Sequence, residues 1–585
     1  MNIVARLLLA AAAAVLLAPA AQAQDDLAER AYNILKVHCY QCHGVEFKVA
    51  KFNVLDHQLL VDEEAELRYL VPGEPESSYL WQRMGIDLDM PPKGIQQRPS
   101  EEELATVRQW IAEGAKLYTP GTERPFISEE QLLAAINADL REVSRADRRH
   151  QRYFSLVHLH NNNNINDADL RLYRAALSKV VNSLSRQPDI IVPVAIDETQ
   201  SVFRIDLRDV GWDDLERWRV VLKAYPYGLQ WTDGRLDDLT DEINEMFALN
   251  NAAPDEIPYL RGDWFVAQAT RPPIYETLLQ LPATVQELEK ELGVNTESDF
   301  TRNRLARAGF AGSGISRSNR LIDRHTGTNS QYYYKSFDFG KSFGRAVLFR
   351  FPLGPKFESN PFNDQHAFEA DGGEIVFSLA NGLQGYYITN AVGATLPEAP
   401  IKVVRDLNEI SGSPVVVNGI SCIGCHRTGV QVFEDSVRGA FLGSAEARSK
   451  VEELYPEPDE MNKLILRDTR RFVAALEEAI GPFIREGTDD TRPIEIFTEP
   501  VTAIARFYDK DISAEEAARE LGQDDGAQFA LTIQNNRALL NAGLGPLARG
   551  DRIPRAMWDA KDESGVSLFQ QTAQALGLAT PINNQ

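Results

Sequence analysis

Cysteine, methionine and histidine are scarce in this sequence, and basic charge falls short of acidic charge. The 585 residues include four cysteines, six methionines and nine histidines, and 61 Lys and Arg against 85 Asp and Glu give a formal net charge of −24. This balance argues against a general nucleic-acid-binding protein, because contacts to phosphates need a basic face. An acidic surface instead suits solubility or docking onto a basic partner. With 43% hydrophobic and 25% charged residues, the composition also excludes a disordered chain, a collagen and a polytopic membrane protein.

Long apolar runs are confined to the N-terminus. Residues 1–23 carry one basic residue, Arg6, then an apolar run from Leu7 to Leu17 and a small-residue site, Ala21-Gln22-Ala23. This order is typical of a secretory signal peptide with cleavage before Gln24, and it predicts a periplasmic mature protein. The alternative is an uncleaved anchor helix, but the run is shorter than the ~20 apolar residues that a membrane span needs. We therefore expect no transmembrane segment in the mature chain.

The four cysteines form two C-x-x-C pairs, and a histidine follows each pair directly. The two motifs are Cys39-Tyr40-Gln41-Cys42-His43 and Cys422-Ile423-Gly424-Cys425-His426. Two thiols three positions apart on one helical turn can add to the two vinyl groups of one haem, and the next His can ligate the iron from the proximal side. The first motif (residues 39–43) and the second motif (residues 422–426) therefore predict two covalently bound haem c groups, haem 1 and haem 2. Haem c is attached outside the bacterial cytoplasm, which agrees with the export signal.

Disulfides and zinc are the alternative uses of four cysteines in an exported chain. Adjacent C-x-x-C pairs make poor structural disulfides. A four-thiolate zinc site would not explain a His after both pairs. With nine histidines in 585 residues, two such coincidences by chance are rare. The sequence therefore favours haem over both alternatives.

Residues 24–118 have the organisation of a small all-α cytochrome c. A helix leads into the first motif, and a second helix begins at the capping box of Ser100 and Glu103 and ends at Gly114. Between them, Met90 lies on a proline-stiffened loop, Asp89-Met90-Pro91-Pro92-Lys93-Gly94, which suits a distal ligand of haem 1. Thioether ligation raises the potential of the iron. The alternatives are that Met90 is a core methionine or that Met84, in a predicted helix, competes for the iron.

Four pieces of this region resemble the planctomycete-type cytochrome c module. They are residues 39–44, residues 71–80 (VPGEPESSYL), Met90-Pro91-Pro92-Lys93 and residues 110–115 (WIAEGA). The resemblance implies a single-haem cytochrome c fold with His43 as the proximal ligand and Met90 as the distal ligand. One departure follows the first motif, where that family is usually Gly-rich and this chain has Val49-Ala50-Lys51-Phe52-Asn53. The loop over one haem edge is therefore expected to differ.

Residues 121–405 predict a mixed α/β domain with an antiparallel sheet in its second half. An alternating run at 202–208 predicts a half-buried strand, and helices are expected from Ser128 to about 149 and from Asp167 to Leu184. Strand-like runs then recur at residues 346–351, 374–379, 385–389 and 401–404. No phosphate-binding loop, dinucleotide fingerprint, nucleophile elbow or further repeat stands out.

The stretch from Ser313 through the second motif is similar to uncharacterised bacterial cytochrome-c-domain proteins. The similar pieces are residues 316–325 (SRSNRLIDRH), 373–379 (GEIVFSL), 381–386 (NGLQGY) and 418–422 (NGISC). The similarity supports the architecture and implies no reaction.

Residues 406–585 predict a mainly helical region that carries haem 2 but no distal ligand of its own. No His follows His426, and the two later methionines, Met461 and Met557, lack the Met-Pro-Pro context. A distal ligand is therefore expected from the middle domain, with His325 and His366 as leading candidates and His158 and His160 behind them. Each could instead be a surface or hydrogen-bonded core histidine, and the iron could be open or bound to water.

Together these patterns predict an α+β multidomain protein with a signal peptide (1–23), a cytochrome c domain (24–118), a mixed α/β domain (121–405) and a mainly helical c-haem region (406–585). Three functions fit. The first is an exported dihaem electron-transfer cytochrome that docks to a periplasmic redox partner with a basic face. The second is a dihaem peroxidase- or oxidase-like oxidoreductase with haem 2 as the reaction centre, which the large middle domain favours. The third is a haem-based sensor or assembly protein.

Overall fold

The computed structural model describes residues 27–43, 54–55, 57–62, 67–92, 98–118, 124–248, 257–311, 319–339, 345–402, 404–485 and 492–583. They form two compact units. The first comprises residues up to 124 together with 163–168, and the second comprises residues 125–162 and 169 onward. The predicted signal peptide, residues 1–23, lies outside the described residues. Within the described part of the chain, no helix combines the length and the apolar character that a membrane crossing requires.

The first unit is helical, as the sequence predicts. Residues 27–38 form the helix that leads into the first motif. Ser100 accepts a hydrogen bond from the Glu103 N–H (3.2 Å), and the Glu103 carboxylate accepts one from the Ser100 N–H (2.7 Å), so the predicted capping box is confirmed. The core includes Leu27, Ala31, Leu35, Val107 and Trp110. The other elements are α2 (Tyr40–His43), α3 (His57–Leu60), η1 (Pro75–Ser77), α4 (Tyr79–Trp81), the π-turn η2 (Gln82–Ile86) and α5 (Glu101–Ala112).

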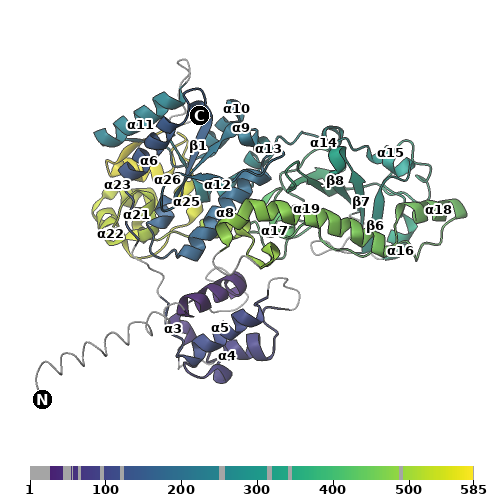
Figure 1. Ribbon diagram of the computed structural model, residues 1–585, viewed down its shortest axis with the longest axis horizontal. Coiled ribbons are helices and arrows are strands. Elements are labelled where there is room, and N and C mark those ends of the chain that lie inside the picture. The colour runs from purple at the N-terminus through teal and green to yellow at the C-terminus, as the bar shows by residue number, and fades with distance from the viewer. Residues whose placement is uncertain are drawn as a thin grey trace, which may run out of the picture. The chain divides into compact units, whose positions relative to one another are not determined.

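The second unit contains a four-stranded mixed sheet of order β2-β3-β1-β5 (Figure 1). Its strands are β1 (Gln151–Ser155), β2 (Val194–Ala195), β3 (Val202–Asp206) and β5 (Leu260–Arg261). Strand β1 pairs antiparallel with β3 and parallel with β5. Helices around this sheet are α6 (Glu129–Glu142), α7 (Val157–His160), α8 (Asp167–Ser183), α9 (Leu207–Val210), α10 (Leu215–Ala224), α11 (Gly234–Phe247), α12 (Gly262–Ala269) and α13 (Ile274–Leu278).

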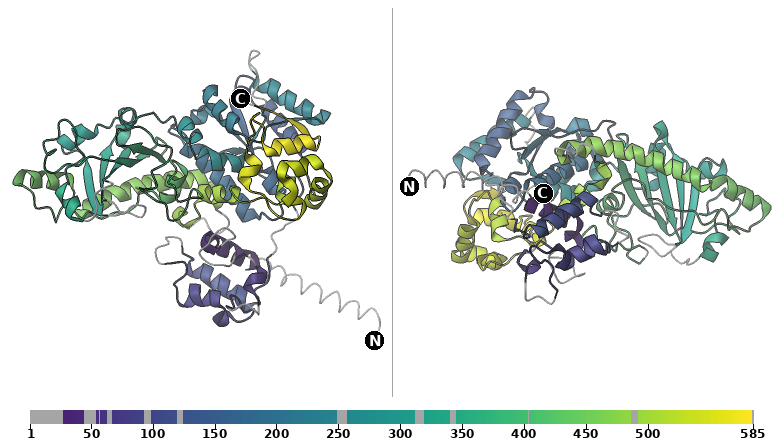
Figure 2. Two further views of the ribbon diagram at one scale, coloured as in Figure 1. Left: turned by 180° about the vertical axis from the view of Figure 1, so that it is seen from behind. Right: turned by 60° about the horizontal axis from the view of Figure 1, so that its bottom comes forward.

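A five-stranded sheet of order β10-β9-β8-β7-β6 is antiparallel throughout, which confirms the prediction for this region. Register partners share a face, so Arg324, Tyr334, Val376 and Tyr386 lie on one side, and His325, Tyr333 and Phe377 lie on the other. Helix α19 (Pro458–Ile484) crosses the first side, where Asp468 pairs with Arg324 at 2.7 Å; this side is called the α19 face (Figure 2). The strands are β6 (Ala306–Ala311), β7 (Asn319–Thr326), β8 (Tyr332–Asp338), β9 (Gly372–Ser378) and β10 (Gln384–Asn390).

The opposite side of this sheet is covered by α14 (Val285–Leu292) and α15 (Thr296–Thr301). Glu289 of α14 accepts a hydrogen bond from Tyr333 (2.9 Å), and Asp299 of α15 contacts His325 (2.9 Å). At the outer end of the sheet lie α16 (Arg345–Arg350) and α18 (Ala445–Leu454), as Figure 1 shows.

The C-terminal residues pack back onto the mixed sheet, where Figure 2 shows the yellow helices beside the blue segments. Strand β4 (Leu229–Trp231) pairs antiparallel with β11 (Ala579–Pro581), and α12 packs on α20 (Pro500–Tyr508). Residues 125–162 and 169–405 therefore lie in one compact unit with residues 406–585. The remaining helices are α17 (Ile420–Cys425), α21 (Ala514–Glu520), α22 (Gly526–Asn535), α23 (Arg537–Leu539), α24 (Gly545–Ala548), α25 (Arg555–Asp559) and α26 (Leu568–Ala575).

Two local predictions need correction. Residues 346–351 belong to helix α16 instead of a strand, because Leu348 alone is buried among the described side chains of α16, whereas a strand would bury alternate residues. Residues 401, 402 and 404 are not in a strand.

Candidate functional site

The first motif lies at the end of the N-terminal helix. The His43 N–H donates to the Cys39 carbonyl (2.9 Å), so these residues are one helical turn apart, and Cys39 packs against the core of the first unit. Burial lowers the pKa of His43, and the positive charge of Arg83 lowers it further. A neutral imidazole is the form that ligates iron. The side chain of Cys42 lies outside the described residues.

The loop that carries Met90 is tied to the preceding helical turn through Arg83. The N–H groups of Asp89 and Met90 both donate to the Arg83 carbonyl (3.1 and 3.2 Å), and the Arg83 guanidinium donates to Asp89 (2.8 Å) and to the Tyr79 hydroxyl (2.7 Å). Because the charge of Arg83 also acts on His43, the loop and the histidine belong to one neighbourhood. The competing Met84 is 3% exposed and lies in the core of this unit. Lys93 and Gly94 fall outside the described residues.

The second motif is carried by α17, which places Cys422 and Cys425 on one helical turn. His426 caps this helix, and its Nδ1 lies 3.1 Å from the Gly429 carbonyl. Burial lowers the pKa of His426 to about 4, so the ring is neutral at pH 7. In a neutral ring Nδ1–H donates to that carbonyl and the lone pair is on Nε2, which is the arrangement that an iron-ligating histidine needs. The donor set therefore fits a covalently held haem.

Helix α17 is packed too closely to tolerate larger residues. Gly419, just before the helix, has φ +91°, and a Cβ there would lie 2.8 Å from the Tyr275 ring and clash with the Thr270 carbonyl. At Gly424 a Cβ would lie 2.6 Å from Ile410. These contacts hold one side of α17 against the protein, while Cys422 and Cys425 remain partly exposed.

The thiols of the second motif are protonated. Burial raises the pKa of Cys422 well above its usual range and that of Cys425 to about 12. Cys39, Cys422 and Cys425 are free of disulfides. Among the described residues, His, Cys, Asp and Glu form no group of three or more that could hold a metal ion.

The segment that follows His426 crosses the α19 face of the five-stranded sheet. The His426 ring lies against Tyr386 of β10 (ring centroids 5.7 Å apart, interplanar angle 32°). Seven residues later Phe433 stacks on Phe310 of β6 (5.8 Å, 27°), and Phe310 is the register partner of Arg320. The second motif therefore lies beside the sheet side chains of this face.

His325 and His366, the leading distal candidates, are not brought to His426. His325 is fully buried on the opposite side of the sheet, where its Nδ1 lies 2.9 Å from Asp299. The His366 ring packs on Phe441 (5.2 Å), and its Nδ1 lies 3.2 Å from the carbonyl of Arg350, the last residue of α16. Figure 1 shows α16 at the outer end of the sheet, away from α17.

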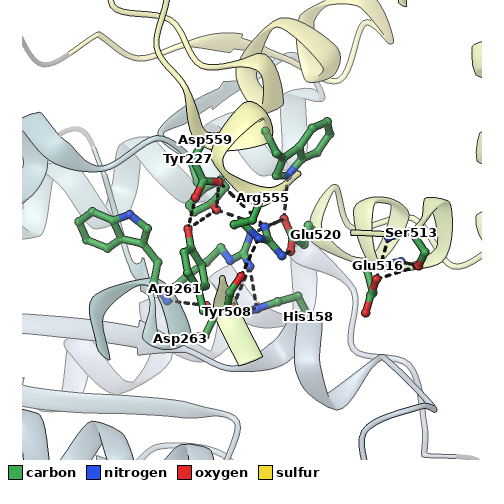
Figure 3. A network of polar contacts seen from close by, with 12 residues as sticks. His158, Tyr227, Arg261, Asp263, Tyr508, Ser513, Glu516, Glu520, Arg555 and Asp559 are labelled. Carbon is green, nitrogen blue, oxygen red and sulfur yellow. Dashed lines mark hydrogen bonds and ion pairs between the residues drawn. The ribbon is translucent and has the colours of Figure 1, made fainter. Parts of the chain in front are cut away.

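The two further candidates also have partners elsewhere. His158 belongs to a buried charged network and lies 2.9 Å from Asp263 and 3.0 Å from Arg261 (Figure 3). His160 Nε2 lies 3.1 Å from the Pro125 carbonyl. Of the methionines, Met461 packs in a core cluster with Val430 and Phe433.

Residues 332–334, the tyrosine run that could relay electrons or simply pack in a strand, lie in β8 and are buried. Their hydroxyls contact Gln384, Glu289 and Asp468, respectively.

Sequence reasoning missed a charged group on the α19 face near the second motif. Arg320 pairs with Asp338 (2.9 Å) and with Glu374 (3.1 Å) across three strands. A signal was available only for Arg320, which is a buried charged residue in a largely buried strand, whereas Glu374 lies among the half-buried positions of β9. The pairing itself follows only from the sheet order.

Comparison with known proteins bears on the first unit. Residues 39–94 match the family model described as planctomycete cytochrome C. Neither a curated protein nor a solved structure matches the chain. The first motif and the Met90 loop both lie within the matched residues, so this part of the chain is similar to a c-type cytochrome module, a family that carries covalently bound haem.

Proposed function

We propose that the protein is an exported dihaem c-type cytochrome that transfers electrons between a redox partner and its two haem groups. The observation that carries this proposal is the second motif: two thiols on one turn of α17, followed by a half-buried, neutral His426 whose Nδ1 is held by the Gly429 carbonyl. Haem c supplies reversible one-electron chemistry. The chain supplies the thioether anchors Cys39, Cys42, Cys422 and Cys425 and the proximal ligands His43 and His426.

At the first site, Met90 is proposed as the distal ligand. Support comes from the backbone hydrogen bonds that fix its loop to Arg83 and from the family match, which spans the loop. A thioether ligand favours ferrous iron, so haem 1 is proposed as the site of higher potential.

The proposed partner is a periplasmic redox protein with a basic docking face. The support is the formal charge of −24, which attracts a positive surface and speeds its association at low ionic strength. Electron-transfer rates with a basic cytochrome should therefore fall as salt rises, and rates with an acidic partner should not.

The first experiment counts haem groups. The chain is expressed with its signal sequence in a host that attaches haem c, and the periplasmic protein is examined by intact mass and by the pyridine haemochrome spectrum. Two haem groups per chain and an N-terminus at Gln24 are expected. One haem per chain would overturn the dihaem proposal, and protein retained in the cytoplasm would overturn export.

A second function, a dihaem oxidoreductase with haem 2 as the reaction centre, is favoured by the placement of the histidines. His158, His160, His325 and His366 all contact other groups, so none of them is assigned as a distal ligand to His426. Binding of carbon monoxide distinguishes the two functions. Two low-spin haems that do not bind carbon monoxide indicate an electron carrier. One high-spin haem that binds it indicates a reaction centre, and peroxide turnover is then measured.

A further inference from the structure

Arg320 and Asp338 form a buried ion pair on the α19 face, and the partly exposed Glu374, whose side chain is 21% exposed, joins them through Arg320. These three residues are called the charged cluster. The Arg320 guanidinium makes two hydrogen bonds to Asp338 (2.9 and 3.0 Å) and one to Glu374 Oε2 (3.1 Å). Burial raises the pKa of Asp338, while Arg320 opposes this rise. Two carboxylates share one cation, so the ionised cluster carries a net negative charge.

This cluster lies beside the second motif. Glu374 is two residues before Val376 on β9, and Val376 is the register partner of Tyr386, the residue that contacts the His426 ring. On the other side, Arg320 is the register partner of Phe310, which stacks on Phe433. The charge of Glu374 reaches both thiols and contributes to the raised pKa of Cys422 and Cys425, while the positive charge of Arg320 contributes to the lowered pKa of His426.

Glu374 is the member of the cluster with an incomplete set of partners. Its Oε1 is buried and has no hydrogen-bond partner, whereas Oε2 contacts Arg320. The negative charge of a carboxylate oxygen that accepts no hydrogen bond acts on neighbouring groups at nearly full strength, because no donor dipole offsets it.

Other charged groups around the motif have mixed signs. Asp406, 1% exposed, accepts hydrogen bonds from the backbone N–H groups of Asn408 and Ile410 and adds negative charge near Cys425. Arg427, which follows His426, adds positive charge. Lys179 and Glu499 neutralise each other at 2.8 Å. With Arg320, Asp338 and Glu374 included, the sum remains negative.

We propose that Glu374, held by Arg320 and Asp338, sets the midpoint potential at the second motif below that at the first motif, so that electrons pass from haem 2 to haem 1. The inference rests on the proposed function, because it requires haem at both motifs. With haem bound at both motifs, each transfer would oxidise the iron of the second site by one electron and reduce the iron of the first site by one electron, and no atom would be exchanged.

The physical basis is the charge of the iron. A nearby negative charge favours ferric over ferrous iron, and the effect is large where water is excluded. A unit charge about 10 Å away, at an effective dielectric constant of about 20, changes a one-electron equilibrium roughly tenfold. Roughly tenfold corresponds to ~59 mV for one electron. At the first site the thioether of Met90 acts in the opposite direction.

The test is a spectroelectrochemical titration of the intact dihaem protein and of Glu374→Gln, which removes the charge and keeps the shape. The second haem is assigned by comparison with the double variant C422S/C425S. In E374Q we expect the midpoint potential of haem 2 to rise by ~59 mV, which corresponds to a roughly tenfold change in the equilibrium constant for reduction. Haem 1 should not move. The matched control is Glu369→Gln, an exposed carboxylate paired with Lys356, which should leave both potentials unchanged.

If E374Q does not fold, Asp338→Asn removes the other carboxylate and leaves Arg320 its pair with Glu374; the same rise is expected. Haem is counted in every sample first. One haem in the wild-type protein overturns the proposed function itself. Two haems with an unmoved haem 2 potential in a folded charge variant, or a wild-type haem 2 potential above that of haem 1, overturn this inference and leave the dihaem assignment intact.

Discussion

The same five-residue pattern occurs in two different settings in this molecule. The first motif continues a helix of a small helical unit, and its His43 is half-buried. The second motif lies on a short helix, α17, packed between other helices and the α19 face of an antiparallel sheet, and burial together with the positive charge of Arg320 lowers the pKa of His426 to about 4. The same sequence pattern therefore occurs in a compact helical unit and in a site built into a larger fold.

The two sites differ in what would control an iron bound there. At the first site a loop would do so, because Arg83 fixes the position of Met90. At the second site nearby charge would do so, because Arg320, Asp338 and Glu374 come together from three strands. Ligand identity and nearby charge are separate means of setting a potential. The predictions below separate them.

The largest effect is expected from removing the thiols of one motif at a time. Cys422→Ser with Cys425→Ser should halve the haem content, as should Cys39→Ser with Cys42→Ser. Only the variant C422S/C425S should also lower the melting temperature of the second unit, because α17 lies in its packed interior. Haem stoichiometry and thermal melts followed by circular dichroism check this. Equal melts for both double variants would show that the second motif is not built into its unit.

Met90→Ala and Met84→Ala form a matched pair in the first unit. Met90→Ala should abolish the weak sulfur-to-iron absorption band. It should also lower the midpoint potential of haem 1 by ~59 mV or more, which corresponds to at least a roughly tenfold change in the equilibrium constant for reduction. Met84→Ala should keep the band and cost about 2–5 kcal/mol of stability, because Met84 is a core residue. Visible spectra and denaturant titrations distinguish them. A band that survives in Met90→Ala removes Met90 from the ligand set.

Gly419→Ala and Gly114→Ala compare how closely the surrounding residues pack against a glycine in each unit. Both glycines have positive φ, +91° and +101°, so each substitution strains the backbone by about 1–2 kcal/mol. Gly114 faces open space, whereas a Cβ at Gly419 meets Tyr275 and the Thr270 carbonyl. We expect about 3–5 kcal/mol of destabilisation at Gly419 and about 1 kcal/mol at Gly114. Urea unfolding of each unit measures this, and similar costs at both positions would mean that α17 can move away from Tyr275.

Local signals in the sequence predict much of this structure. The capping box at Ser100 forms as expected, because a cap depends on residues three positions apart. The predicted helix at 167–184 and the strand that begins at Val202 are also confirmed as α8 and β3. Periodicity and caps are properties of a short segment, so a single sequence contains them.

Long-range placement could not be predicted in the same way. Whether His325 faces the second motif depends on strand register, and one residue of shift would reverse its face. Glu374 and Arg320 are 54 positions apart, and only the order of β7, β8 and β9 brings them together. The same holds for Tyr227 and Asp559, which meet because the C-terminal strand β11 pairs with β4.

The smallest expected effect is a pH dependence confined to the second unit. Tyr227 and Tyr508 both donate to Asp559 (2.5 Å each) in the network of Figure 3, and burial raises the pKa of Asp559 from 3.8 to about 6. Between pH 4 and 6 the folded state keeps a proton that the unfolded chain has released, so this carboxyl lowers stability as pH rises through that window. The shift corresponds to at most about 3 kcal/mol.

Asp559→Asn removes this titration. Relative to wild type, the variant should gain stability as pH rises from 4 to 7, by about 1–3 kcal/mol, while the first unit is unaffected. Denaturant unfolding at each pH measures the difference, with the absorbance of haem 1 as the reference signal for the first unit. A gap between wild type and variant that stays constant from pH 4 to 7 would mean that Asp559 has the same pKa in the folded and the unfolded chain. The two tyrosine hydrogen bonds would then offset the cost of burying the carboxylate, and the network would add no pH dependence to the second unit.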